Sequence, residues 1–99
     1  MQELDWNLIR SFVAVAQTGS LSAAARQLGG SQPTLGRHIA ELERATGLKL
    51  FRRGRAGYEP TDDGLVLLAR AEEVSDRASA FMRAALGAST ETMSGTVRI

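Results

Sequence analysis

The chain has 99 residues, enough for one small domain with an appended segment. It contains no cysteine and one histidine, which excludes a disulfide framework, a cysteine-based zinc site and a histidine-rich metal site. There is neither an apolar run of about eighteen residues nor a signal-peptide pattern at the start, so we expect a cytoplasmic protein without a membrane span.

The charge of the chain is concentrated in its middle third. The net charge is +1, but residues 26–55 hold seven basic residues against two acidic ones, a local balance of +5. The net charge is −1 over residues 1–25 and −3 over residues 56–99. A local positive field attracts phosphate whatever the total charge, although the same residues are compatible with ordinary solvated helix faces.

Two helices are predicted at the start of the chain. The first runs from about Asp5, which can cap it, to Gln17, with apolar residues at helical spacing, and Thr18-Gly19 ends it. Ser20 caps a shorter, alanine-rich helix over residues 21–28. Its alanines either allow a neighbouring helix to approach closely or only favour helix formation.

A third helix follows Gly29-Gly30 and extends to about Ala45. Ser31 can cap it, and Pro33 falls in its first turn, where a missing N–H costs nothing. Its apolar residues share one face: Leu35, Ile39 and Leu42. We therefore expect one buried side and one largely polar, exposed side.

Two short helices joined by a glycine-containing turn are typical of a helix-turn-helix, which we place at about residues 21–45. In that geometry the first turn of the second helix enters the major groove of DNA. The candidate DNA-contacting residues are Ser31, Gln32, Pro33, Thr34, Arg37 and His38. Glutamine can pair with adenine and arginine with guanine, while threonine or proline can touch a thymine methyl group. The pattern alone is equally compatible with an ordinary helical pair, and a lone histidine with a simple surface group.

A basic hairpin is predicted next, over residues 48–59. A strand from Leu48 to Phe51, a flexible loop over residues 53–57 and a return strand at Tyr58-Glu59 would form it. It carries the basic cluster Arg52, Arg53 and Arg55. Such a ribbon beside a recognition helix can act as a wing on the DNA backbone or minor groove, and the alternative is a solvated turn.

A long helix is predicted from the Thr61 cap to about Leu86, with Asp62 and Asp63 well placed at its N-terminus. Small and apolar residues recur along it with alternating spacings of four and three: Leu67, Ala71, Val74, Ala78, Phe81 and Ala85. This spacing is typical of a coiled-coil seam, so we predict dimerisation through this helix. Alternatively, one face packs on the preceding domain, as we expect for Leu65 and Leu68.

The end of the chain is predicted to leave the helix. Residues 87–95 are small and polar, which indicates a linker, and residues 96–99 alternate like the start of a strand. We interpret residues 88–99 as a hinge followed by the beginning of a further domain.

In order and spacing, the chain resembles the N-terminal part of LysR-type transcriptional regulators. The matching stretches are Leu8-Ile9-Arg10-Ser11-Phe12, residues 19–25, Leu28, Ser31-Gln32-Pro33, residues 39–43, Gly47, Leu50-Phe51-Arg52-Arg53, and Thr61 with Gly64. The resemblance implies a mainly α fold: a winged helix-turn-helix of three helices and a two-stranded wing in residues 1–60, then a dimerising linker helix in residues 61–87.

The resemblance also implies a function. It places Ser31, Gln32, Pro33, Thr34 and Arg37 at DNA-facing positions and the three arginines in the wing. We expect a sequence-specific transcription regulator that binds double-stranded operator DNA as a homodimer and assembles as a tetramer at full length. A small-molecule effector would bind a C-terminal domain beyond these residues, and no cofactor is expected here.

The sequence departs from the family pattern at three places. Gly29-Gly30 replace a polar and an apolar residue in the turn, which predicts a looser turn, and Pro60 replaces a common leucine. Gly36 stands where a hydroxyl residue is frequent, which removes one contact to a phosphate or base.

Two other classes of function compete with this one. A winged helix can serve as a protein–protein interaction module whose basic face binds an acidic partner. An enzyme is not expected, because Ser20, His38 and Asp62 lack the glycine-rich nucleophile turn of a hydrolase triad.

Overall fold

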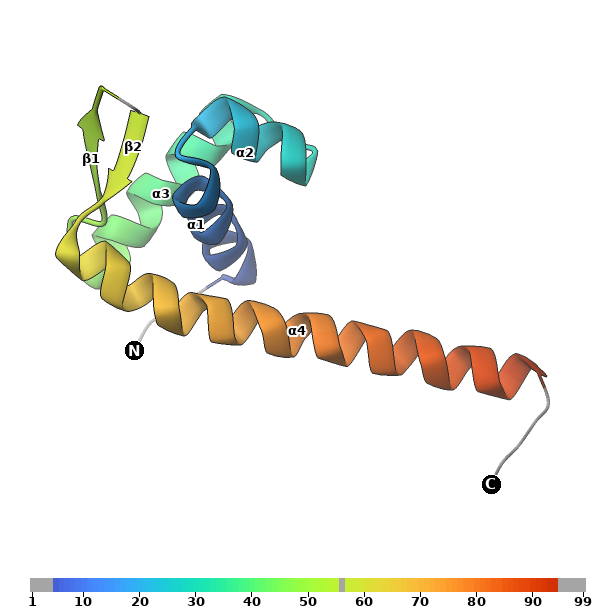
Figure 1. Cartoon of the computed structure of the whole chain (residues 1–99). Coiled ribbons are helices and arrows are strands. Elements are labelled where there is room, and N and C mark those ends of the chain that lie inside the picture. The colour runs from blue at the N-terminus through green and yellow to red at the C-terminus, as the bar shows by residue number, and fades with distance from the viewer. Residues whose placement is uncertain (1–4, 56, 95–99) are drawn as a thin grey trace.

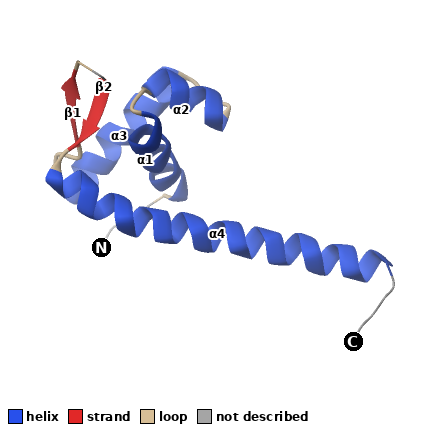
Figure 2. Cartoon of the chain, viewed as in Figure 1, coloured by secondary structure: helices blue, strands red, loops and turns tan. Residues whose placement is uncertain are grey.

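The computed structural model describes residues 5–55 and 57–94, with side chains described as far as residue 87. Four helices and one antiparallel hairpin make up this part of the chain (Figures 1 and 2). In chain order they are α1 (Trp6–Thr18), α2 (Leu21–Leu28), α3 (Gln32–Thr46), β1 (Phe51–Gly54), β2 (Gly57–Pro60) and α4 (Asp62–Ser94). The predicted mainly α fold, with a two-stranded wing and a long final helix, is confirmed.

The first three helices begin at the predicted caps. The side chain of Asp5 accepts from the Asn7 N–H, that of Ser20 from the Ala23 N–H, and that of Ser31 from the Thr34 N–H. Each helix ends at a glycine with a left-handed backbone conformation. The turn before α3 is firmly hydrogen-bonded despite its two glycines, because the N–H groups of Gly29 and Gly30 both donate to the Ala25 carbonyl.

The hydrophobic core surrounds α1, which packs against α2, α3 and α4. Phe12 and Val15 of α1 are fully buried, together with Leu50, which lies just before the hairpin. The apolar face predicted for α3 is buried as expected: Leu35, Ile39 and Leu42. One core therefore joins the helix-turn-helix, the base of the hairpin and the start of α4.

The first strand of the hairpin begins three residues later than predicted, whereas the second strand contains the predicted Tyr58-Glu59. The paired residues run from Phe51↔Pro60 to Gly54↔Gly57, so the prediction of a strand from Leu48 was wrong. The N–H groups of Leu50 and Phe51 donate to the carboxylate of Glu43, at 2.8 and 3.3 Å, and the Lys49 carbonyl accepts from the Thr61 hydroxyl. Because these backbone groups are already satisfied, strand pairing begins only at Phe51.

The fourth helix begins as predicted, with the Thr61 hydroxyl accepting from the Gly64 N–H at 3.0 Å. It continues to Ser94, so the linker predicted from Gly87 is helical over most of its length. A single glycine without a proline costs a helix only about 1 kcal/mol, which does not end it. The strand predicted for residues 96–99 lies outside the described residues. In Figure 1, α4 projects far beyond the other elements.

Candidate nucleic-acid interface

The first turn of α3 presents an exposed surface. Gln32 and Pro33 are exposed, whereas Thr34 is half-buried. The Ser31 hydroxyl is engaged within the turn, because it accepts from the Thr34 N–H and donates to the Thr34 Oγ1 at 3.0 Å. Gln32 is therefore the exposed amide side chain of this turn, and Arg37 stands exposed one turn later.

His38 lies on the other flank of α3. Its ring is half-buried, and Nδ1 lies 2.7 Å from the hydroxyl of Ser11, a residue of α1 that is 3% exposed. The side chain thus joins α3 to α1. This position favours a structural role for His38 over the DNA contact predicted for it, which stays untested.

The three arginines predicted for the wing are all exposed but differ in their surroundings. Arg52 forms an ion pair with Glu59 across the hairpin, at 3.7 Å. The guanidinium of Arg53 lies over the ring of Tyr58, 4.6 Å from its centroid. Arg55 has no ion-pair or hydrogen-bond partner among the described residues. The structure therefore gathers the cluster on one hairpin while restraining two of its three members.

The hairpin is anchored to the helical domain at two places. The Tyr58 N–H donates to the Gly19 carbonyl at 3.0 Å, and a Cβ on Gly57 would collide with that same oxygen. On the other side, the ring of Phe51 packs edge-on against Phe12 in the core and against Tyr58. The wing is thus held at a fixed position beside the helix-turn-helix.

Sequence reasoning missed two residues that build this surface. Glu43 fixes the segment between α3 and the hairpin through its two backbone contacts, and Tyr58 supports Arg53. Local sequence signals for both are weak, because both act on residues that folding brings near. The glutamate on the flank of the buried helix face is the one hint that the sequence contains.

The predicted seam on α4 divides into a covered and an open part. Ala71 is 9% exposed and Leu67 is half-buried, since both pack against the core. Val74 is 44% exposed and Phe81 71% exposed. Leu65, expected to pack on the domain, is instead 54% exposed, because Leu67 and Leu68 occupy the face that contacts the core. Of the remaining seam members, Ala78 is half-buried and Ala85 is exposed.

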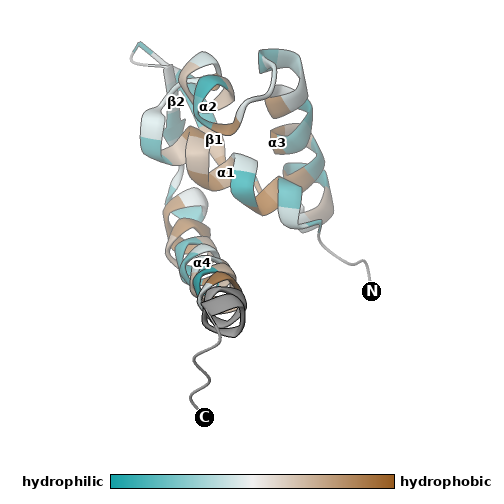
Figure 3. Cartoon of the chain, turned by 90° about the vertical axis from the view of Figure 1, so that its right-hand side faces the viewer, coloured by the Kyte–Doolittle hydropathy of each residue, from teal (hydrophilic) through white to brown (hydrophobic). Residues whose placement is uncertain are grey.

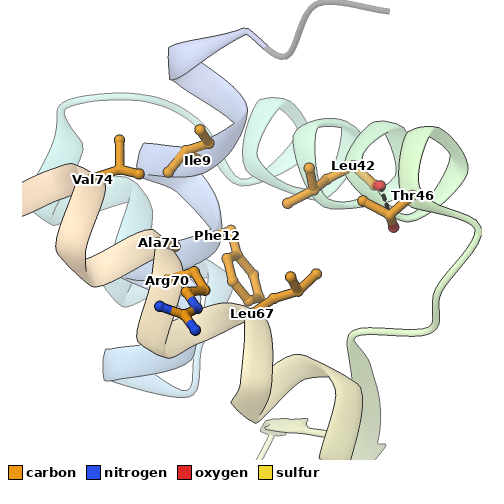
Figure 4. Close-up of a pocket in the computed structure, with 8 residues that line it drawn as sticks. All are labelled: Ile9, Phe12, Leu42, Thr46, Leu67, Arg70, Ala71 and Val74. Atoms are coloured by element: carbon orange, nitrogen blue, oxygen red, sulfur yellow. Dashed lines mark hydrogen bonds between the residues drawn. The ribbon is translucent and has the colours of Figure 1, made fainter. Parts of the chain in front are cut away.

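An apolar groove of about 180 Å³ separates α4 from α1 and α3 at the boundary between these parts (Figure 4). Phe12 and Leu67 line its centre, while Ile9 and Val74 line one end. Hydrophobic residues also appear on α4 when the molecule is turned to look along that helix (Figure 3). The open part of the seam thus continues directly from the core.

Other kinds of site find little support in the described part of the chain. No group of three potential metal ligands comes together within residues 5–55 and 57–94. None of the helices described is both long and apolar enough to cross a bilayer.

Comparison with known proteins adds a family match. Residues 6–65 match the family model described as bacterial regulatory helix-turn-helix protein, lysR family. The small neutral protease regulatory protein of Streptomyces coelicolor is 46% identical over 68 residues, which are 69% of this chain and 22% of that protein. The transcriptional activator BauR of Pseudomonas aeruginosa is 39% identical over 64 residues, 65% of this chain and 21% of that protein. The chain thus spans about a fifth of these two relatives.

Solved structures share the fold along most of the chain. Corynebacterium glutamicum OxyR, in its C206S mutant, has a TM-score of 0.84 at 31% identity, over 89% of this chain and 28% of that one. The CbnR DBD–DNA complex has a TM-score of 0.70 at 34% identity, over 84% of this chain and 99% of that one. The BenM DBD in complex with benA site 1 DNA has a TM-score of 0.75 at 28% identity, over 83% of this chain and 95% of that one.

Proposed function

The chain belongs to the LysR family of bacterial helix-turn-helix regulators, and from this membership we propose that it binds specific duplex DNA sites to regulate transcription. The proposal rests on one observation above all. The exposed first turn of α3 lies in the same rigid unit as a hairpin with three exposed arginines. Two of the similar solved structures are complexes with DNA, which favours this function over a protein–protein interaction module.

In the proposed complex, α3 supplies the contacts to bases. Gln32 and Arg37 contact base edges in the major groove, where an amide pairs with adenine and a guanidinium with guanine. Ser31, Pro33 and Thr34 border the same surface. Their small side chains allow the helix to approach the bases. Pro33 has no N–H and the Thr34 N–H donates to the Ser31 hydroxyl, so the Gln32 N–H is the donor of this turn that can favour a nearby phosphate.

The wing supplies contacts that do not depend on sequence. Arg52, Arg53 and Arg55 lie on the hairpin beside α3, where their charges face the phosphate backbone or the minor groove. Charge neutralisation of this kind accounts for most non-specific affinity and makes binding depend on salt. We therefore assign affinity to the hairpin and sequence preference to α3.

Two copies of the chain bind together in this proposal. Half-sites one helical turn apart are separated by about 34 Å, so two recognition helices need a device that fixes their distance. A helix of 33 residues is about 50 Å long, which is sufficient for that purpose. The open part of the seam, from Val74 to Ala85, is the surface we assign to the second copy.

The wider expectations for the full-length protein follow from the family alone. We propose a cytoplasmic regulator without enzymatic activity that forms tetramers and responds to a small-molecule effector bound outside these residues.

The test is a selection of DNA from a random duplex pool, followed by binding assays on selected and unselected duplexes. Gln32→Ala should cost about 1–3 kcal/mol on the selected site and little on unselected DNA, because glutamine carries no charge. Arg37→Ala should weaken binding to both kinds of duplex, and binding to the selected site more strongly. Gln17→Ala is the matched control, since its exposed amide donates to Glu72 on α4.

Two outcomes would contradict the proposal. A pool without any enriched sequence would remove sequence-specific binding. Equal weakening of both duplexes by Gln32→Ala would remove the contact to bases.

A further inference from the structure

A cleft of about 220 Å³ lies between α3 and the hairpin, and of its lining residues only Arg53 has been assigned to DNA so far. Gly36 and Ala40 contribute its α3 side, and Lys49, Arg53 and Tyr58 contribute the hairpin side. Small residues on α3 leave the cleft open toward the exposed face of that helix. The cleft therefore lies between the two regions that the proposed function places on DNA.

Two cations border this cleft without a carboxylate partner. Within the part of the chain that the structure describes, neither Lys49 nor Arg53 forms an ion pair. Arg53 is held over the Tyr58 ring, with Nη1 at 3.5 Å from the phenol oxygen, and the Lys49 carbonyl accepts from the Thr61 hydroxyl at 2.6 Å. The charge of Arg53 thus starts from a restrained position, which lowers the entropy lost when it binds an anion, whereas for Lys49 it is the backbone that is fixed.

One acidic group also lines the cleft. Glu43 would repel an anion, but its Oε2 atom accepts the N–H groups of Leu50 and Phe51. These two dipoles offset part of its charge, and the side chain is half-buried. The exposed charge at the mouth of the cleft is therefore positive.

The path of DNA past a winged helix-turn-helix explains what such a cleft can bind. A recognition helix in the major groove and a wing on the adjacent minor groove straddle one sugar-phosphate strand, because that strand separates the two grooves. The strand must then pass between α3 and the hairpin, where Lys49 and Arg53 lie.

We propose that this cleft binds one phosphate of the DNA backbone, with Lys49 and Arg53 as the contacting cations and Tyr58 as the residue that positions Arg53. The proposal rests on the proposed function and deepens it. It assigns a contact to Lys49, which the sequence showed only as part of the basic middle third, and a role to Tyr58.

The first test measures the affinity of the chain for a random-sequence duplex over a series of salt concentrations. Lys49→Ala should lower affinity about five- to tenfold and reduce the salt dependence by about one ion, while Lys49→Arg should retain both. Arg83→Ala is the matched control, because it removes one exposed positive charge on α4 and should leave the slope unchanged.

The second test uses the fact that Lys49 is the only lysine of the chain. Acetylation of its amine by an amine-reactive ester, followed by mass spectrometry, should be slowed several-fold by bound duplex. Circular dichroism of Lys49→Ala verifies that the variant is folded.

The third test separates positioning from folding at Tyr58. Tyr58→Phe keeps the ring under Arg53 and should preserve most of the affinity, whereas Tyr58→Leu should lower it about threefold. In an Arg53→Ala background, Tyr58→Leu should have no further effect. A purely structural role for Tyr58 would give the same loss in both backgrounds and would overturn the positioning role.

The failure of this proposal is distinct from the failure of the proposed function. A wild-type chain that binds no duplex would remove the function itself. A wild-type chain that binds with normal salt dependence, while Lys49→Ala has the same slope and Lys49 is acetylated equally fast with DNA, would overturn only the phosphate site.

Discussion

The two halves of α4 carry the same apolar spacing in different surroundings. In the proximal half, Ala71 is buried and Leu67 packs against the core that α1 and α3 form. In the distal half, where α4 extends beyond the winged domain (Figure 1), Phe81 is exposed. Apolar residues spaced alternately four and three apart therefore do not reveal whether the same chain or a second copy covers them.

The difference between the halves shows how one helix can both complete the core of the domain and offer a surface for association. The proximal half is a structural part of the winged domain, so its substitutions should change the free energy of unfolding. The distal half contributes little to that core, so its substitutions should change association while leaving the domain folded. Three substitutions test the surroundings of the two halves, with Ala80→Asp as a control.

The largest effect is expected for a charge in the proximal half. Ala71→Asp would place a carboxylate among apolar side chains of α1 and α4, while Arg70, the cation at the rim of the same groove, already pairs with Glu73 at the surface. The substitution should lower the free energy of unfolding by about 3 kcal/mol. Ala80→Asp adds the same charge at an exposed position and should change it by less than about 0.5 kcal/mol. Urea denaturation of both variants measures the difference. Equal stabilities would show that the proximal half is not part of the core.

A smaller loss is expected at Gly64, in the first turn of α4. A Cβ there would collide with the carbonyl oxygen of Leu50, which also accepts from the Thr61 N–H. Gly64→Ala should therefore lower the free energy of unfolding by about 2 kcal/mol, although alanine favours helices. The melting temperature provides the measurement, and a variant as stable as the wild type would show that α4 does not approach Leu50 so closely.

The smallest effect, with the opposite sign, is expected at Gly87 in the distal half. No atom lies within 4 Å of a Cβ built on it. Gly87→Ala should stabilise the helix by about 0.5–1 kcal/mol, because glycine loses more backbone freedom on folding. Far-ultraviolet circular dichroism should show a slightly higher helix content and less loss of helix on heating than in the wild type. A lower helix content would contradict the open surroundings of this residue.

Local chemistry made much of this fold predictable. The helix caps can be recognised from the sequence, because short polar side chains accept from N–H groups a few residues ahead. They are Asp5, Ser20 and Ser31. The buried face of α3 follows equally from helical spacing.

Contacts between distant segments were not predictable in the same way. The hairpin begins at Phe51 because the carboxylate of Glu43 accepts the N–H groups of Leu50 and of Phe51 itself. His38 binds Ser11, 27 residues earlier, and Arg53 rests on Tyr58 across the hairpin. Each of these depends on a residue brought near by folding, so the spacing of residues in one segment cannot reveal it.

For the predicted site residues, the structure gives their exposure but does not test their contacts. Gln32, Arg37 and Arg55 are exposed where the sequence placed them. Their contacts to DNA stay predictions, as does association through Phe81. The family membership and the fold, by contrast, rest on agreement along most of the chain.

The central claim, that a second copy covers the distal half of α4 so that two winged domains bind DNA together, is tested most directly by sedimentation equilibrium of Phe81→Asp. We expect a dimeric wild-type chain, a monomeric Phe81→Asp with an unchanged melting temperature, and a dimeric Ala80→Asp, whose charge lies about 100° around the helix from Phe81 and outside the seam. On a duplex with two half-sites, Phe81→Asp should bind much more weakly than the wild type, and on a single half-site equally well. A Phe81→Asp chain that stays dimeric and keeps its full affinity for two half-sites would contradict the account.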